Sequence, residues 1–171
     1  DLVSQVASSG ARAVVIRSGK DGGFVAGADI TEFSGFKNVE QAYRLVRTGQ
    51  QVFDRIEALP VPTVAAIHGF ALGGGLELAL ACDYRVGADD GKLNLGLPEV
   101  MLGIHPGFGG TVRMPQLIGA PAALDLLLTG KSLRAEEALK LGLVDRLVPR
   151  EKLADAARDI ALAAPPLRRA P

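Results

Sequence analysis

The chain has 171 residues, of which 48% are hydrophobic, and this is enough for one domain with a substantial core. Lysine and arginine together number 19, as do aspartate and glutamate, so the formal net charge is zero. The overall charge therefore does not favour binding to nucleic acid or to an anionic membrane. The one cysteine excludes an internal disulfide framework and favours a reducing compartment, and no apolar run approaches the length of a membrane span.

The first half of the chain predicts short buried strands separated by helices and glycine-rich turns. Residues 12–18 and 63–67 are continuous apolar runs, which are typical of strands buried on both faces of a parallel sheet. Residues 38–59 carry apolar side chains at helical spacing until two prolines end the helix. The remaining predicted elements of this half are a loop over residues 19–29, a helix over 76–82, and strands over 83–88 and 92–95.

The second half of the chain is mainly helical. After Pro106 we expect helices over residues 107–113, 121–128, 134–141 and 151–164, and one more short strand over residues 143–148. Apolar strands that alternate with helices indicate an α/β fold with parallel strand pairing. The sequence shows no internal repeat and no second domain.

Both ends of the chain resemble cut ends. Leu2, Val3 and Val6 have helical spacing, as in the tail of a helix that begins upstream, and no basic and then apolar leader precedes them. Residues 165–171 are rich in proline and resemble a linker. We therefore expect one domain over residues 1–164, incomplete at its N-terminus, and then a Pro-rich linker or a C-terminal extension.

A glycine-rich turn between the second strand and the following helix predicts an anion-binding site. Its glycines, Gly73 to Gly75, let the main chain approach a ligand closely. Free N–H groups at the start of a helix then point at the negative charge of that ligand. Glu77 lies in the first turn of this helix, and a carboxylate beside such a turn favours acid–base chemistry on a substrate that becomes negative during reaction.

Glu99 is a second isolated carboxyl, the only formally charged residue between Lys92 and Arg113. Apolar surroundings raise the pKa of a carboxyl, whereas the helix dipole favours the ionised form of Glu77. Two carboxyls whose pKa values are pushed apart form a natural pair, so we expect Glu77 to ionise more readily and Glu99 to carry a proton. Spacing along the chain does not show that the two glutamates lie together in space. The alternative is therefore that each of them faces solvent.

Other patterns have structural interpretations. Gly130-Lys131-Ser132 imitates the end of a phosphate-binding loop, but that loop needs a glycine where Asp125 stands. His68 and His105 lack a third ligand at suitable spacing, so we expect no metal site. Cys82 predicts a buried, inert thiol. The charged side chains of the first long helix predict a solvated face, formed by Arg44, Arg47, Asp54, Arg55 and Glu57.

Two glycine-containing segments of the chain form a pair, residues 24–33 (Phe-Val-Ala-Gly-Ala-Asp-Ile-Thr-Glu-Phe) and 69–79 (Gly-Phe-Ala-Leu-Gly-Gly-Gly-Leu-Glu-Leu-Ala). They resemble the two oxyanion-binding segments of the crotonase, or enoyl-CoA hydratase/isomerase, superfamily. Residues 97–99 and 103–111 are similar to its second catalytic segment, and residues 128–145 to its downstream helix and strand. These motifs occur in the family's order over nearly the whole chain, which is more specific than any one of them.

The resemblance implies a spiral of ββα units and a site for acyl-CoA thioesters. It implies that the amides of Ala28 and Gly74 bind the thioester oxygen, that Glu77 activates a water and that Glu99 protonates the α carbon. The amide of Gly107 is implied to help hold the water. The other implied substrate-binding positions are Gly27, Asp29, Ile30, Thr31 and Gly73.

Residues 28–33 and 107–110 are most similar to the hydratase domain of multifunctional fatty-acid oxidation proteins. This implies a hydratase of β-oxidation that needs no cofactor, with NAD used only if a 3-hydroxyacyl-CoA dehydrogenase domain follows outside this chain. The implied partners are an acyl-CoA substrate and either further copies of the chain or a thiolase subunit, with no nucleic acid. A bacterial-like cytoplasmic location is expected, with mitochondria or peroxisomes as alternatives.

Two other functions stay open at this point. A 3-enoyl- to 2-enoyl-CoA isomerase needs only one of the two glutamates, so the presence of both favours the hydratase. A non-catalytic relative that binds acyl-CoA or RNA is disfavoured by the two carboxyls and by the zero net charge. Leu76 stands where relatives often have cysteine, a tolerable change on an apolar wall.

Overall fold

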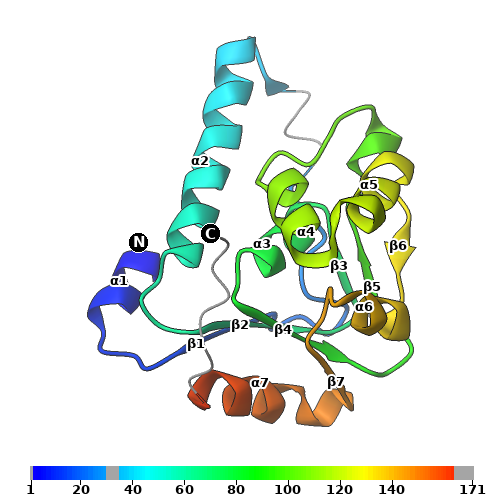
Figure 1. Ribbon diagram of the computed structural model, residues 1–171. Helices are drawn as coiled ribbons and strands as arrows, with labels where there is room; N and C mark the ends of the chain where they lie inside the picture. The colour runs from blue at the N-terminus through cyan, green and yellow to red at the C-terminus, as the bar shows by residue number, and fades with distance from the viewer. Residues whose placement is uncertain (1, 30–34, 164–171) are drawn as a thin grey trace.

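A computed structural model describes residues 2–29 and 35–163 of the chain, and Figure 1 shows it. Helix α1 (Leu2–Ser8) leads into strand β1 (Val14–Arg17), and the long helix α2 (Val39–Glu57) follows. The later elements, in chain order, are β2 (Thr63–Ile67), β3 (Phe70–Leu72), α3 (Gly74–Leu80), β4 (Tyr84–Ala88), β5 (Asn94–Gly96), the 3₁₀ helix η2 (Pro98–Leu102), α4 (Gly110–Ile118), α5 (Ala120–Thr129), β6 (Ser132–Leu133), α6 (Ala135–Leu141), β7 (Arg146–Val148), the 3₁₀ helix η3 (Arg150–Lys152) and α7 (Leu153–Leu162).

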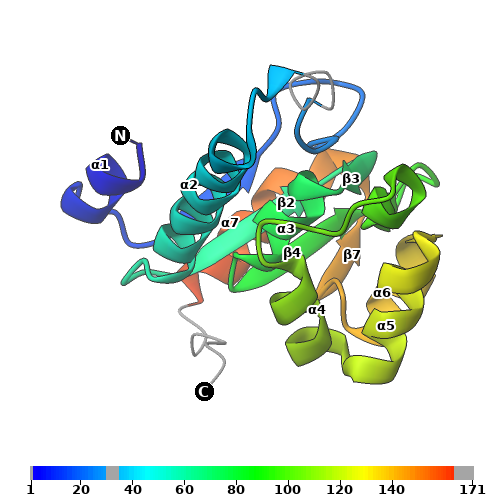
Figure 2. The same cartoon turned by 90° about the horizontal axis from the view of Figure 1, so that it is seen from above.

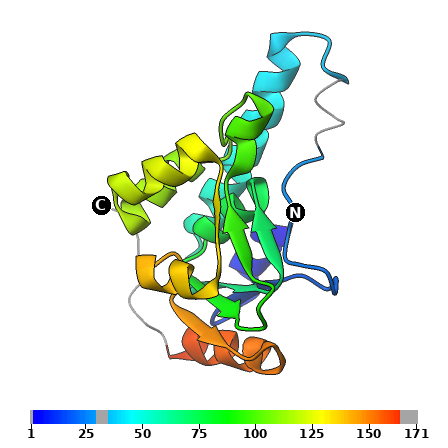
Figure 3. The same cartoon turned by 90° about the vertical axis from the view of Figure 1, so that its right-hand side faces the viewer.

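The strands form two sheets between which the chain passes repeatedly. The first has the order β1-β2-β4-β7 and is parallel throughout. The second has the order β3-β5-β6, in which β3 and β5 are parallel and the short β6 is antiparallel. Strands β3 and β5 stand side by side in Figure 3. The chain moves from β2 to β3 and from β4 to β5, so each pass adds a strand to both sheets and the backbone forms a spiral.

Both faces of the central strands β2 and β4 are buried, which explains their continuous apolar sequences. Strand β1 lies at the edge of the sheet and alternates between half-buried and exposed residues, so the prediction that residues 12–18 are buried on both faces is wrong. Val64 and Ala66 of β2 pack in one cluster with Ala157 of α7, the helix that lies beneath the sheet in Figure 1. Ala65 and Ile67 of the same strand belong to a second cluster that includes the buried side chains of α3. Because successive side chains of a strand point to opposite faces, a strand between two helix layers has no position for an exposed polar residue.

Helix α2 stands beside the sheets and contributes to one wall of the site. Its first residue is preceded by Asn38, whose side chain accepts a hydrogen bond from the amide of Gln41 at 3.0 Å and caps the helix. Ile56, near its C-terminal end, is the buried residue of this helix. Its N-terminal half projects beyond the sheets in Figure 1, and Figure 2 shows the helix from above.

The predicted α/β layering with parallel pairing is confirmed, and the helices and strands that differ do so for local reasons. The sequence did not predict β3, η2 or β6, because two to five residues are too few to display a period. The helix expected over residues 107–113 is instead α4, which begins at Gly110. Residues 107–109 form a turn, since Gly109 has a φ of 108° that a helix does not allow. Most of the other predicted helix and strand ends lie one to three residues from the observed ends.

The start of α3 packs directly on Val25, which forms an isolated β-bridge with Ala71 of β3. This contact predicts a stability effect. A Cβ at Gly75 would lie 2.1 Å from the carbonyl oxygen of Val25, which is a backbone atom and cannot rotate away. We expect Gly75→Ala to lower the free energy of unfolding by about 1–3 kcal/mol, as overpacking does. Urea unfolding followed by circular dichroism measures this change.

The matched control is Gly19→Ala, because a Cβ at Gly19 meets nothing within 4 Å. We expect this variant to stay within about 0.5 kcal/mol of the original protein. Equal unfolding midpoints for the two variants would contradict the close approach at Gly75.

Candidate active site

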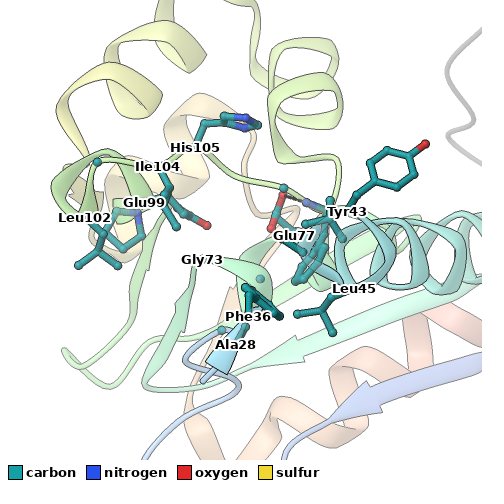
Figure 4. A pocket seen from close by; sticks show the side chains of 18 of the residues that line it. Ala28, Phe36, Tyr43, Leu45, Gly73, Glu77, Glu99, Leu102, Ile104 and His105 are labelled. Atoms are coloured by element: carbon teal, nitrogen blue, oxygen red, sulfur yellow. Dashed lines mark hydrogen bonds between the residues drawn. The ribbon is translucent and has the colours of Figure 1, made fainter. Parts of the chain in front are cut away.

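Glu77 and Glu99 face one cavity of about 720 Å³, enclosed by α2, the turn before α3, η2 and the segment after η2. Figure 4 shows the two carboxyl side chains entering it from opposite sides. Among the described residues that line the cavity, these two are the only carboxyl groups. Most of the remaining wall is apolar and includes Phe36, Leu45, Val46, Leu102 and Ile104. The fold thus brings together two residues whose convergence the sequence left open.

The carboxylate of Glu77 is held at the start of α4. Its Oε1 accepts hydrogen bonds from the amides of Phe108 at 2.7 Å and Gly110 at 2.8 Å. The residue is 1% exposed, so water does not solvate its charge. Burial raises the pKa of Glu77, while the two amides, then the charge of Arg113 and the nearby imidazole of His105, act in the opposite direction.

Glu99 occupies the first turn of η2 and is less well satisfied. Its Oε2 is the one buried side-chain oxygen without a hydrogen-bond partner in residues 2–29 and 35–163. A Cβ at Gly73 would lie 3.1 Å from its Oε1, so the glycine turn comes close to this carboxyl. Burial raises the pKa of Glu99, a hydrogen bond from its own backbone amide acts in the opposite direction, and the negative charge of Glu77 raises the pKa further.

The expectation that the surroundings push the two pKa values in opposite directions is therefore wrong. Burial raises the pKa of both carboxyls above the ordinary value of 4.5. The dipole of α3 was expected to favour ionised Glu77, but the side chain reaches the amides at the start of α4 instead. The difference between the two groups lies in their hydrogen bonds, because amide donors stabilise a carboxylate and an unpartnered oxygen favours a carboxylic acid.

The amides of Ala28 and Gly74 come from separate segments that lie in contact at the cavity. A Cβ at Gly74 would lie 3.7 Å from the nitrogen of Ala28, and a Cβ at Gly27 would lie 3.3 Å from the nitrogen of Gly74. Within the part of the chain that the structure describes, neither nitrogen donates to a backbone acceptor. The assignment of these two amides to an oxyanion-binding site remains a prediction.

The other predicted substrate-binding residues fall into three groups. Gly27, Gly73 and Gly107 line the cavity. Asp29 is exposed and is not among the lining residues. Ile30 and Thr31 lie outside the described residues, so their assignment remains a prediction.

The side chains that support the turn at residues 107–110 had no signal in the sequence. Asp54 and Glu57, expected on a solvated helix face, both form ion pairs with Arg113 at 2.7 Å. Gln50 of the same helix donates from Nε2 to the carbonyl of Gly107 at 2.7 Å. The amide donors to Glu77 did have a signal, because the glycines at 107–110 open a helix as those at 73–75 do.

The segment around Lys131 and the thiol of Cys82 agree with their structural interpretations. Lys131 pairs with Asp125, and its segment follows α5 rather than a strand, unlike a phosphate-binding loop. His68 Nε2 lies 2.8 Å from the carbonyl oxygen of Lys20. Burial raises the pKa of the Cys82 thiol to about 12, which makes it inert.

Among the described residues there is neither a metal-binding cluster nor a membrane-spanning helix. No group of three or more histidine, cysteine, aspartate or glutamate side chains within them is arranged to hold a metal ion. None of the helices they form has the length and apolarity that crossing a bilayer requires.

Comparisons with known proteins agree with this geometry. The model of the family described as enoyl-CoA hydratase/isomerase matches residues 4–164. The fatty acid oxidation complex subunit alpha of Aliivibrio fischeri is 58% identical over 151 residues, which are 88% of this chain and 22% of that protein. The enoyl-CoA hydratase of Bacillus anthracis has a TM-score of 0.88 at 40% identity, with 95% of this chain and 62% of that chain covered.

A second solved structure leads to the same fold. The enoyl-CoA hydratase of Thermoplasma volcanium has a TM-score of 0.85 at 35% identity, with 95% of this chain and 64% of that chain covered. The predicted crotonase-like α/β fold is thus confirmed. The chain spans less than two thirds of the length of each of these relatives.

The burial of Glu99 predicts how stability depends on pH. Its pKa in the folded chain is raised above the ordinary 4.5, so its favourable contribution is present below that value and is lost as pH rises through the folded value. Glu99→Gln removes this loss. We expect the melting temperature of the variant, relative to the original protein, to be about 1–4 °C higher at pH 8 than at pH 4.5 in thermal unfolding.

Glu40→Gln is the matched control, because Glu40 is exposed and pairs with Arg44 on the surface of α2. Its difference in melting temperature should not rise between the two pH values. A constant difference for Glu99→Gln would contradict the raised pKa.

Proposed function

Because this chain belongs to the enoyl-CoA hydratase/isomerase family, we propose that it adds water across the double bond of a 2-enoyl-CoA thioester. The observation that carries the proposal is the pair of carboxyls on one cavity, Glu77 bound by two amides and Glu99 with a buried, unpartnered oxygen. Hydration needs a base for the water and an acid for the α carbon. Moving a double bond needs only one such group, so the pair supports the hydratase over the isomerase.

The amides of Ala28 and Gly74 serve the thioester oxygen. Attack on the β carbon places negative charge on this oxygen, and two donors that are already oriented stabilise the charge where it develops. The loss of one such donor typically costs about 3 kcal/mol of transition-state stabilisation. The apolar cavity wall, which includes Leu45 and Ile104, excludes water and strengthens these hydrogen bonds.

Glu77 and Glu99 divide the proton transfers. Ionised Glu77 takes a proton from the water as the oxygen of the water bonds to the β carbon. Protonated Glu99 then donates its proton to the α carbon as the enolate collapses. The product is a 3-hydroxyacyl thioester, and exchange with solvent returns a proton to Glu99 and removes one from Glu77. Addition of water transfers no electrons to a carrier, so the step itself requires no redox cofactor.

The wider setting of the chain is also part of the proposal. The similarity to a fatty acid oxidation complex subunit alpha supports a role in fatty-acid β-oxidation within a longer polypeptide, with the hydratase domain over residues 1–164 and a linker over residues 165–171. NAD would then serve a 3-hydroxyacyl-CoA dehydrogenase domain elsewhere in that polypeptide. A thiolase subunit or further copies of the chain are the proposed partners.

Substitution of either carboxyl tests the mechanism. We expect Glu77→Gln and Glu99→Gln each to lower kcat about 10²- to 10⁴-fold, because general acid–base catalysis contributes this much. The assay follows the loss of conjugated thioester absorbance from a 2-enoyl-CoA in the intact protein. Exposed Glu40→Gln is the control and should keep the original rate.

The same assay separates the alternatives. Full activity in both variants would exclude the two-carboxyl mechanism. Isomerisation of a 3-enoyl-CoA without hydration of a 2-enoyl-CoA would make the protein an isomerase. Binding of acyl-CoA without turnover would make it a non-catalytic relative.

A further inference from the structure

The turn at residues 107–110 is held on two sides. Toward the cavity, the amides of Phe108 and Gly110 donate to Oε1 of Glu77. On the other side, the carbonyl of Gly107 accepts from Gln50 and the carbonyl of Phe108 accepts from Nη1 of Arg113 at 3.0 Å. The peptide group of residues 107 and 108 is therefore fixed at both its oxygen and its N–H, so its direction toward Glu77 is set from α2.

Arg113 connects this turn to two carboxylates of α2. Its Nε and Nη2 donate to Oε2 of Glu57 at 3.0 and 2.7 Å, and Nη2 also donates to Oδ1 of Asp54 at 2.7 Å. Arg113 is 9% exposed, so it depends on these partners. A guanidinium offers several donors in a rigid plane, whereas lysine offers a single point charge.

The turn itself makes room for the guanidinium. A Cβ at Gly109 would lie 2.1 Å from Nη1 of Arg113, and the φ of Gly109 is 108°. A side chain at this position would therefore clash with Arg113 and strain the backbone. The glycine between the two amide donors serves the support of the turn rather than a direct contact with Glu77.

We propose that Arg113, anchored on Asp54 and Glu57, is a positioning residue for Glu77. It holds the Phe108 carbonyl so that the neighbouring amides point at Glu77, and its charge favours the ionised carboxylate. The inference rests on the proposed function, in which ionised Glu77 is the general base. It adds that the acidity of this base is set from α2.

The charged and titratable groups around Glu77 make the effect of each substitution predictable. Arg113 and His105 act to lower its pKa, and Glu99 faces it across the cavity. Asp54 and Glu57 offset part of the positive charge of Arg113. Loss of Arg113 therefore raises the pKa of Glu77, and neutralisation of Asp54 and Glu57 lowers it.

The first experiment removes the guanidinium in the intact protein. For Arg113→Met we expect the acidic limb of the kcat pH profile to move to higher pH by about 0.5–1 unit, because the base then needs a higher pH to ionise. Misplacement of the base should lower kcat about 10- to 100-fold with little change in KM. Arg113→Lys should move the acidic limb less than Arg113→Met does, since lysine keeps the positive charge.

The second experiment keeps the shape of the network and changes its charge. Asn and Gln can still accept the hydrogen bonds of Arg113, so Asp54→Asn with Glu57→Gln should move the acidic limb to lower pH. A merely structural network would shift both variants in the same direction or neither. Arg44→Met, on the exposed surface of α2, is the control for the loss of a positive charge and should leave the limb in place.

The outcomes separate this inference from the proposed function. Failure of the original protein to hydrate a 2-enoyl-CoA overturns the function. If the protein is a hydratase but the acidic limb of its pH profile does not move in Arg113→Met, only the role of Arg113 is overturned. The same holds if the limb moves to higher pH in the double variant. If Arg113→Met does not fold, the double variant decides, and a limb that does not move to lower pH overturns the inference.

Discussion

The side chain of Glu77 is 1% exposed, and a carboxylate so far from water is costly to ionise unless donors surround it. The amides of Phe108 and Gly110 provide these donors and stand at the start of α4. This interaction requires α3 and α4 to pack closely and the turn at residues 107–110 to adopt one conformation. A Cβ at Gly110 would lie 3.0 Å from Cγ of Glu77, so there is little room for any side chain larger than glycine.

The apolar cavity shifts the pKa values of both carboxyls in the same direction, and hydrogen bonds then make the two groups different. Burial raises the pKa of Glu77 and of Glu99 alike. Glu77 regains part of its acidity from two amides and from Arg113. Glu99 regains some from its own amide, and its Oε2 has no partner among the described residues. A base and an acid can therefore share one apolar cavity without opposite electrostatic surroundings, because donor placement at one carboxyl makes the two unequal.

Helix α2 combines two roles on one face. Its apolar side chains contribute to the cavity wall, and its polar side chains bind the turn that holds Glu77. The ring of Phe53 packs edge-on against the ring of Phe108 at 5.7 Å, beside the ion pairs of Arg113. A change in the position of α2 would therefore alter the shape of the substrate cavity and the hydrogen bonding of Glu77 together.

The sequence by itself determined the elements that local patterns encode. These are the central strand β2 that is buried on both faces, the long amphipathic helix, the glycine turn before α3 and the two isolated carboxyls. Only the tertiary structure decided which groups meet. Glu77 is bound by backbone amides that lie 31 and 33 residues further along the chain. Arg113 pairs with carboxylates that lie 56 and 59 positions away. The charges of Asp54 and Glu57 look like those of any solvated helix, because residue spacing records periodicity within one element. Contacts between elements depend on how α2, α3 and α4 pack, and that packing also decided that burial raises the pKa of both carboxyls.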